Sequence, residues 1–379
     1  MKTKLEILLI AAVLTFGATG CTDKTSTDTT GSDAPLAKVA PVDSSQRAVA
    51  STDEANRTAI GGVNWDNYVV AETDWYLNGV QQKAGVNTWM HDDPVSKDNQ
   101  QVIRSNRDVV YSIAVVDVSE GATFSVPAAG LENDQFQIIH IMDENHLFHK
   151  VVRRGESVTV NADDLTTGTH VYLLSRTKDN GDFEDTKRRQ AQLKFSAKSS
   201  KPFPAKGFTE KDVLAYRDQL VANVMIGKAT VTGLDGFGAT MNDVKDNDYK
   251  HAAAVGWGGL PASTAQYLPA ITGQGSTACQ TWTVPNPDLD YETRGGYWSI
   301  TTYSAQGWIE TDEFYLSGEK MQDNGDDTST AYFNCPDVAS SFKVTEGWTA
   351  VVRFYEPVDV QENLKYLEKL GTISLKTIE

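Results

Sequence analysis

Residues 108–118 read DVVYSIAVVDV, a run dominated by β-branched and aromatic side chains. Such a run is typical of a β-strand. Similar runs follow, separated by Gly, Asp and Asn, at residues 122–126, 135–142, 157–160 and 169–176. Strands at this spacing predict an antiparallel β-sandwich or barrel in this part of the chain.

The rest of the chain combines helical and strand patterns. We expect a helix over residues 64–83 and another beginning at Thr209, where Asp212 completes a capping box with Asp in place of Glu. Residues 183–195 fit an edge helix or a strand, 242–254 fit a weaker helix, and Asp359 caps a last amphipathic helix. Further strands are expected at 277–284, 297–303, 313–316, 330–334 and 348–355.

These patterns predict a mainly β fold with a helical connector. It contains two β-sandwich domains, and the C-terminal one is jelly-roll-like. The expected division is a signal peptide (1–20), a disordered tether (21–60), an N-terminal β domain (61–200), a helical connector (201–255) and a C-terminal β-sandwich with a terminal helix (256–379).

The N-terminus predicts export and lipidation. Lys2 and Lys4 precede a short apolar run, and the small residues 17–20 lead to Cys21, as in a bacterial lipobox. Acyl chains on Cys21 would anchor the protein to the cell envelope, and Thr22 favours the outer membrane, facing the periplasm or the cell surface. The alternative is an ordinary secretory signal with Cys21 incidental. The polar segment that follows cannot bury enough apolar surface to fold and is expected to act as a tether.

The composition argues against one class of binding partner and predicts a disulfide bond. A formal net charge of −17 argues against nucleic acid as a partner. Cys279 and Cys335 are the only cysteines after Cys21. In an exported protein such a pair predicts a disulfide. Two separate buried thiols are the alternative.

Several segments resemble known families. The stretch VIRSNRDVVYS (102–112) resembles the Arg-x-Asn-x-Asp-x-x-Tyr-Ser segment of the bacterial domain of unknown function numbered 1254. The stretches GWGGLP (256–261), GYWSITTY (296–303) and RFYEP (353–357) resemble the partner domain numbered 1214. The resemblance covers most of residues 64–360 and implies two β domains. It implies no established activity, so it assigns no catalytic residue, and the Leu/Lys-rich end of this chain departs from longer members.

Two sets of residues are candidates for a ligand site. Polar residues at a strand entrance and aromatic or basic residues of the C-terminal half could meet at the domain junction, where small-molecule sites are frequent. These candidates are Arg104, Asn106, Asp108, Tyr111, Trp257, Trp298, Tyr303 and Arg353. Because glycines flank Trp257, we expect it to form an adjustable wall of the pocket. The alternative is that these residues are turn-forming and core residues.

His140, Asp143, His146 and His149 are the densest group of metal-ligand types. Their chemistry suits zinc or another divalent ion, but their spacing matches no known ligand motif. A polar turn with hydrogen-bonded histidines is the alternative, so no cofactor is expected unless this group holds a metal. The acidic run 179–182 is similarly expected to be an exposed turn.

The sequence lacks a serine-nucleophile elbow, a phosphate-binding loop and a dinucleotide fingerprint. We therefore expect a non-catalytic envelope lipoprotein that binds a small molecule or glycan at the domain junction. One alternative is a hydrolase or lyase with an unfamiliar, metal-dependent site. Another is a structural or assembly component of the envelope. A homodimer is compatible with each of these.

Overall fold

The computed structural model describes residues 58–100, 104–128, 136–225, 228–229, 231, 233–272 and 276–378. The predicted signal peptide, Cys21 and nearly all of the tether lie outside these residues. The described strands form four sheets that are almost entirely antiparallel, with comparatively few helices. The prediction of a mainly β fold with several sheets is therefore confirmed.

The strands from β1 to β8 form what we call the N-terminal β unit. Its main sheet has the order β1-β2-β7-β4-β5: Met90–His91, Val109–Asp117, His170–Lys178, Gln137–Met142 and Lys150–Arg153. A smaller sheet has the order β6-β3-β8: Ser157–Val160, Ala122–Ser125 and Lys194–Ala197. Alternate residues of β2, such as Ala114 and Val116, face the smaller sheet and form a core with it.

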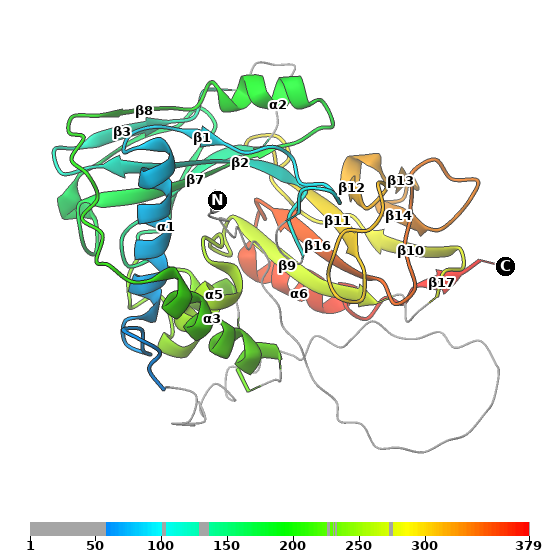
Figure 1. Cartoon of the computed structure of the whole chain (residues 1–379). Helices are drawn as coiled ribbons and strands as arrows, with labels where there is room; N and C mark the ends of the chain where they lie inside the picture. The colour runs from blue at the N-terminus through cyan, green and yellow to red at the C-terminus, as the bar shows by residue number, and fades with distance from the viewer. Residues whose placement is uncertain are drawn as a thin grey trace.

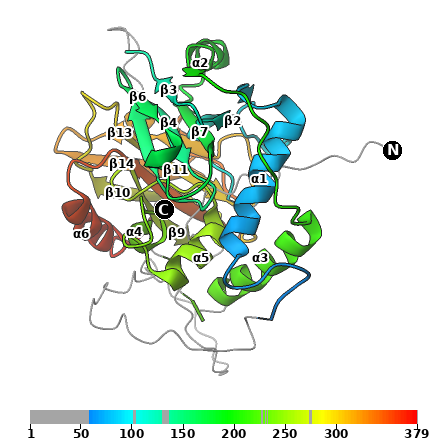
Figure 2. The same cartoon turned by 90° about the vertical axis from the view of Figure 1, so that its left-hand side faces the viewer.

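The helices lie mainly on the other side of this main sheet. They are α1 (Tyr68–Ala84), α3 (Glu210–Met225), α4 (Gly233–Gly236) and α5 (Asp246–Gly256), with α2 (Phe183–Gln190) beside the end of β7. Figure 2 shows α1 and α3 along one side of the molecule and α6 on the other. One of the two bonds of the predicted capping box is present, because Thr209 Oγ1 accepts from the Asp212 N–H at 3.2 Å. The Thr209 hydroxyl also donates to Asp212 Oδ2 at 2.8 Å. Residues 183–195, predicted as helix or strand, begin as α2 and end in β8.

The strands from β9 to β17 form the C-terminal β unit, which lies on the right of Figure 1. One sheet has the order β12-β11-β16-β9: Tyr315–Ser317, Tyr297–Tyr303, Thr349–Tyr355 and Ala265–Thr272. We call this the inner sheet. The other, which we call the outer sheet, has the order β13-β14-β10-β17, with β15 paired to β14: Gln322–Asp323, Thr328–Phe333, Gln280–Pro285, Lys376–Thr377 and Ser341–Phe342. Two short 3-10 turns occupy Ala162–Asp164 and Gly318–Lys320.

A core of large aromatic side chains lies between these two sheets. Trp282, Trp348 and Phe333 are completely buried there. The final helix α6 (Val360–Leu370) covers the core with Leu367 and Leu370. Its N-cap is Asp359, as predicted, whose side chain accepts hydrogen bonds from the Gln361 and Glu362 N–H groups.

The disulfide prediction is confirmed. Cys279 and Cys335 are bonded, with 4.5 Å between their Cα atoms. The bond joins the start of β10 to the loop after β14, within the outer sheet of the C-terminal β unit. In the part of the chain that the structure describes, no helix is both long and apolar enough to cross a membrane.

Candidate functional site

The inner sheet of the C-terminal β unit has one apolar face and one polar, tyrosine-rich face. Along β11, Trp298 and Ile300 enter the core between the two C-terminal sheets. The residues that alternate with them face the opposite way, toward the N-terminal β unit. This tyrosine-rich face consists of Tyr297, Ser299, Thr301 and Tyr303 from β11, Arg353 and Tyr355 from β16, Tyr267 from β9 and Tyr315 from β12. Tyr297 and Tyr355 belong to the same core as Tyr111 and Val109 of β2, so the two units meet here. We call this contact the junction.

Asp108 is the central acceptor of the junction. It lies at the start of β2 and is completely buried. Ser299 Oγ donates to its Oδ1 at 2.8 Å, and the Tyr355 hydroxyl donates to its Oδ2 at 2.7 Å. Asn106 holds the turn by accepting from the Asp108 N–H at 2.8 Å, and its Nδ2 donates to the Tyr355 hydroxyl at 3.1 Å. Side chains from both units are thus joined in one hydrogen-bonded network.

Arg353 is the buried cation of this network. Its guanidinium donates to Thr301 Oγ1 and to the Tyr303 hydroxyl, both at 2.9 Å, and to the Arg104 carbonyl at 3.3 Å. Its Nε lies 3.9 Å from Asp108 Oδ2. Burial lowers the pKa of Arg353, but the surrounding hydroxyls and the Asp108 carboxylate outweigh burial and raise it. The guanidinium is therefore charged at every ordinary pH.

Arg176 is a second buried arginine, contributed by β7 of the N-terminal β unit. It is directly paired with Tyr111 of β2, and its guanidinium lies 5.6 Å from the centre of the Tyr111 ring. It donates to the Gly258 carbonyl at 2.6 Å and to His140 Nδ1 at 3.3 Å. Gly258 has a φ of +76°, which favours glycine, and a Cβ there would come within 2.8 Å of the Leu174 side chain, which would have to move.

Tyr267 brings β9 into the same region. It is paired with Arg353 across the sheet and is half-buried, unlike most of the junction residues. Burial raises its pKa to about 12, and the charges of Arg176 and Arg353 lower it only in part. Tyr267 thus lies beside Arg353 on the tyrosine-rich face and is still partly exposed.

The histidines predicted as metal ligands form a hydrogen-bonded chain instead. His140 Nε2 lies 2.9 Å from His149 Nδ1, and His149 Nε2 lies 2.9 Å from the His146 carbonyl. Because Arg176 and the Gly258 N–H can only donate, they fix every tautomer in the chain: His140 and His149 carry hydrogen on Nε2, and His146 carries it on Nδ1. Burial lowers the pKa of all three, that of His149 to about 4, so all three are neutral.

Asp143 does not join these histidines. Its carboxylate accepts from the backbone N–H groups of Asn145, Leu147 and Thr166 and thereby holds the loop after β4. Among the described residues no three His, Cys, Asp or Glu side chains are arranged to bind a metal ion. The predicted metal group is thus a polar turn with hydrogen-bonded histidines, which was the alternative interpretation.

The prediction that Trp257 lines an open pocket is wrong. Trp257 is 4% exposed, stacks on Tyr76 with 4.1 Å between ring centres, and donates from Nε1 to Thr73 Oγ1 at 3.1 Å. Trp298 is also a core residue, on the face of β11 that points away from the junction. A shallow surface depression, lined by Ser125, Pro127, Gln192 and Lys194, lies at the edge of the smaller N-terminal sheet instead.

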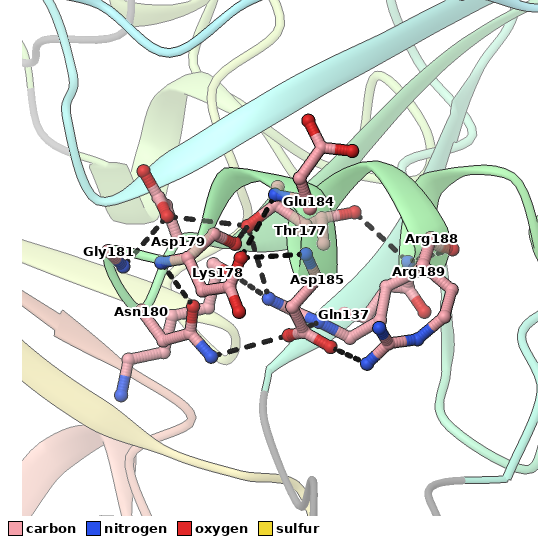
Figure 3. A network of polar contacts seen from close by, with 12 residues as sticks. Gln137, Thr177, Lys178, Asp179, Asn180, Gly181, Glu184, Asp185, Arg188 and Arg189 are labelled. Carbon is pink, nitrogen blue, oxygen red and sulfur yellow. Dashed lines mark hydrogen bonds and ion pairs between the residues drawn. The ribbon is translucent and has the colours of Figure 1, made fainter.

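Ion pairs connect the two units around the junction. Arg153 contacts the buried Glu356 through Nε at 2.9 Å, and Lys178 pairs with Glu319 at 2.6 Å. Arg107 pairs with Asp179 and lies over the ring of Tyr315. Figure 3 shows the C-terminal end of β7 beside helix α2, where Arg189 of the helix donates to the Lys178 carbonyl.

The loop in Figure 3 is internally hydrogen-bonded. Asp179 accepts from the Gly181 N–H at 2.9 Å, and Asp185 accepts from Arg189 at 2.9 Å. The run 179–182 therefore forms a hydrogen-bonded turn, as expected, but its first residue, Asp179, is buried rather than exposed.

Three non-glycine residues beside the junction have left-handed backbones. They are Arg104 (φ 54°), His146 (φ 54°) and Glu356 (φ 56°). Such conformations cost of order 1 kcal/mol each, and they gather at functional sites more often than elsewhere.

Comparison with known proteins supports the fold and does not identify the activity. The VPA0106 protein from Vibrio parahaemolyticus is 14% identical, with a TM-score of 0.57, over 83% of this chain and 98% of that one. An uncharacterized protein from Burkholderia cenocepacia is 12% identical, with a TM-score of 0.42, over 83% and 87% of the two chains. At this identity the first likeness shows a shared fold alone. No protein-family model and no functionally curated protein matches the chain.

Proposed function

We propose that this chain is a lipid-anchored protein of the bacterial cell envelope that binds a small molecule at the junction, near Tyr267. The observation that supports the proposal is the hydrogen-bonded network around Asp108, which joins side chains of both β units, with the half-buried Tyr267 on the same face. Small-molecule sites favour such places, because a few fixed polar groups in an apolar surround can orient a ligand.

The electrostatics favour binding over catalysis. Burial raises the pKa of Tyr111, Tyr303 and Tyr355 as well as that of Tyr267, so their phenols remain neutral hydrogen-bond donors. The nearby histidines have lowered pKa values and are committed to their own chain. None of these groups is poised to exchange a proton near neutral pH, which general acid–base catalysis requires.

The anchoring part of the proposal rests on the sequence around Cys21. A Cys21→Ser variant is expected to accumulate as unlipidated precursor and to leave the membrane fraction, because the acyl chains attach to that sulfur. Fractionation of cells that express the two proteins measures this. If the variant pellets with membranes as completely as the parent, the lipid anchor is wrong.

The binding part can be tested by adding bulk at Tyr267. Tyr267→Trp adds bulk at the half-buried position, and Tyr332→Trp adds the same bulk on the outer sheet. In a thermal-shift screen of metabolites and glycans, a true junction ligand should stabilise the parent and Tyr332→Trp but not Tyr267→Trp. A ligand that stabilises all three equally binds elsewhere, and a screen without any stabilising compound contradicts the proposal.

A further inference from the structure

The loop between β4 and β5, residues 143–149, joins the main sheet to the helices that follow it in the chain. We call it the histidine loop, because it carries His146 and His149. Three hydrogen bonds connect it to α5 and to the segments on either side of α5. They run from the Gly258 N–H to His146 Nε2 at 2.8 Å, from the Phe148 N–H to the Ala239 carbonyl at 3.0 Å, and from the Tyr249 hydroxyl to the Asn145 carbonyl.

No imidazole of the histidine chain can take up a proton without losing a hydrogen bond. The nitrogens that carry no hydrogen are His140 Nδ1, His149 Nδ1 and His146 Nε2. Each of them already faces a donor, which is Arg176 at 3.3 Å, His140 Nε2 at 2.9 Å and the Gly258 N–H at 2.8 Å, respectively. A proton on His146 would place two donors face to face and break the bond that holds Gly258.

The surroundings offer a protonated histidine no compensating charge. The three imidazoles are buried, and the charged group that faces them is a cation, Arg176 of β7. The other described groups around the loop are apolar or already hydrogen-bonded. They are Phe237, Trp257, Val151 of β5, Asp143 on backbone N–H groups, Glu144 with Lys206, and Tyr249 of α5 on the Asn145 carbonyl.

The closed histidine loop also has an unfavourable backbone. His146 has a φ of 54° and Phe148 a φ of 68°, so two non-glycine residues within three positions are left-handed. Such a conformation persists only where the surrounding contacts hold it. Loss of the bond between His146 and Gly258 removes one of these contacts and lets the backbone relax.

We propose that the histidine loop is an acid-sensitive latch. It fastens α5 and the Gly258 segment to the main sheet while its histidines are neutral, and it opens locally when they bind protons between pH 7 and pH 5. The proposal concerns a movement of the chain, so it goes beyond the proposed function and does not depend on a ligand.

The size of the response follows from linkage. In the open loop a histidine regains its ordinary pKa of about 6.5, whereas burial lowers the pKa of His149 in the closed loop to about 4. The open form therefore binds protons that the closed form does not, and the population of the open form rises as pH falls. His149 alone raises it about 20-fold between pH 7 and pH 5, and His146 acts in the same direction.

Hydrogen exchange of the purified full-length protein tests the latch. After correction for the intrinsic pH dependence of amide exchange, peptides that cover residues 143–149 should lose about 20-fold or more of their protection between pH 7 and pH 5. At pH 5 their exchange should not respond to urea below the unfolding transition, because a local opening exposes little surface. If urea accelerates it as steeply as in β10 and β14, the protein opens as a whole and the latch is refuted. Unchanged protection between the two pH values also refutes it.

A neutral variant then assigns the proton. His146→Gln keeps an acceptor for the Gly258 N–H but binds no proton near pH 5, so its loss of protection should be roughly tenfold smaller than that of the parent. His91→Gln removes an exposed histidine that bonds to Ser112 outside the chain, and it should behave as the parent. Equal pH dependence in His146→Gln and the parent overturns the proposal. If His146→Gln does not fold, the response of the parent to urea still decides.

Discussion

The neutral histidine chain predicts that the folded protein loses stability as pH falls from 7 to 5. His140, His146 and His149 are buried, and burial lowers their pKa values below the ordinary value of about 6.5. The unfolded chain therefore binds protons on these histidines near pH 6.5, whereas the folded chain does not. Stability is fully present above that pH and falls as pH drops toward each folded pKa, which for His149 is about 4.

The size of the effect follows from the width of this window. Each group contributes about 1.4 kcal/mol per pH unit between its unfolded and folded pKa values. At pH 5 the unfolded value of about 6.5 lies about 1.5 units away, which gives roughly 2 kcal/mol for His149, whose folded pKa is about 4. His140 and His146 act in the same direction. Asp92 acts in the opposite sense, because burial raises its pKa to about 6, and it offsets about 1 kcal/mol of this loss by pH 5.

Urea denaturation of the parent and of His149→Gln at pH 7 and pH 5 isolates one member of the chain. The variant should be less stable at pH 7, since it loses the bonds to His140 and to the His146 carbonyl. Its further loss between pH 7 and pH 5 should be about 2 kcal/mol smaller than that of the parent. Equal m-values in both proteins show that the unfolded states are comparable. If the two proteins lose the same free energy between these pH values, His149 is not held neutral by the fold.

Three further substitutions or treatments test other parts of the fold. Trp257→Ala should cost about 3–5 kcal/mol of unfolding free energy in a denaturant titration, because it empties a core site, and a loss below 1 kcal/mol would contradict the packing. Reducing the Cys279–Cys335 bond should cost about 4 kcal/mol on the chain-entropy model, measured as a fall in the denaturation midpoint. Asp108→Asn should cost about 3–5 kcal/mol by leaving Arg353 unpaired, and a neutral result would show that the hydroxyls alone stabilise this cation.

The sequence predicted several residues of the junction correctly but missed Tyr267. The candidates Asn106, Asp108 and Arg353 are indeed brought together, although they lie in different β units. The segment of β9 was not predicted as a strand, and Tyr267 was missed with it. Pro269 interrupts this run, and proline argues against a central strand because it lacks an N–H donor. β9 lies at the edge of its sheet, where that donor is not needed.

Other errors have equally specific causes. Glycines around Trp257 suggested an adjustable wall of a pocket, but Gly258 has a positive φ, and its backbone carbonyl and N–H are bonded to Arg176 and His146. The loop is therefore packed, and its Trp lies in the core. Arg176 ended a predicted strand and was not among the candidate site residues. Only its pairing with Tyr111 places it on the buried face of the sheet, and pairing between distant strands cannot be read from one strand alone.

The two buried arginines of the junction are stabilised in different ways. Arg353 has an acid, two hydroxyls and a carbonyl around it, all supplied by the protein itself. Arg176 instead donates to the Gly258 carbonyl and to the neutral His140, and its guanidinium lies over the ring of Tyr111. Because removing a partner from a buried charge is strongly destabilising, the neutral state of His140 stabilises Arg176 as well as the histidine chain.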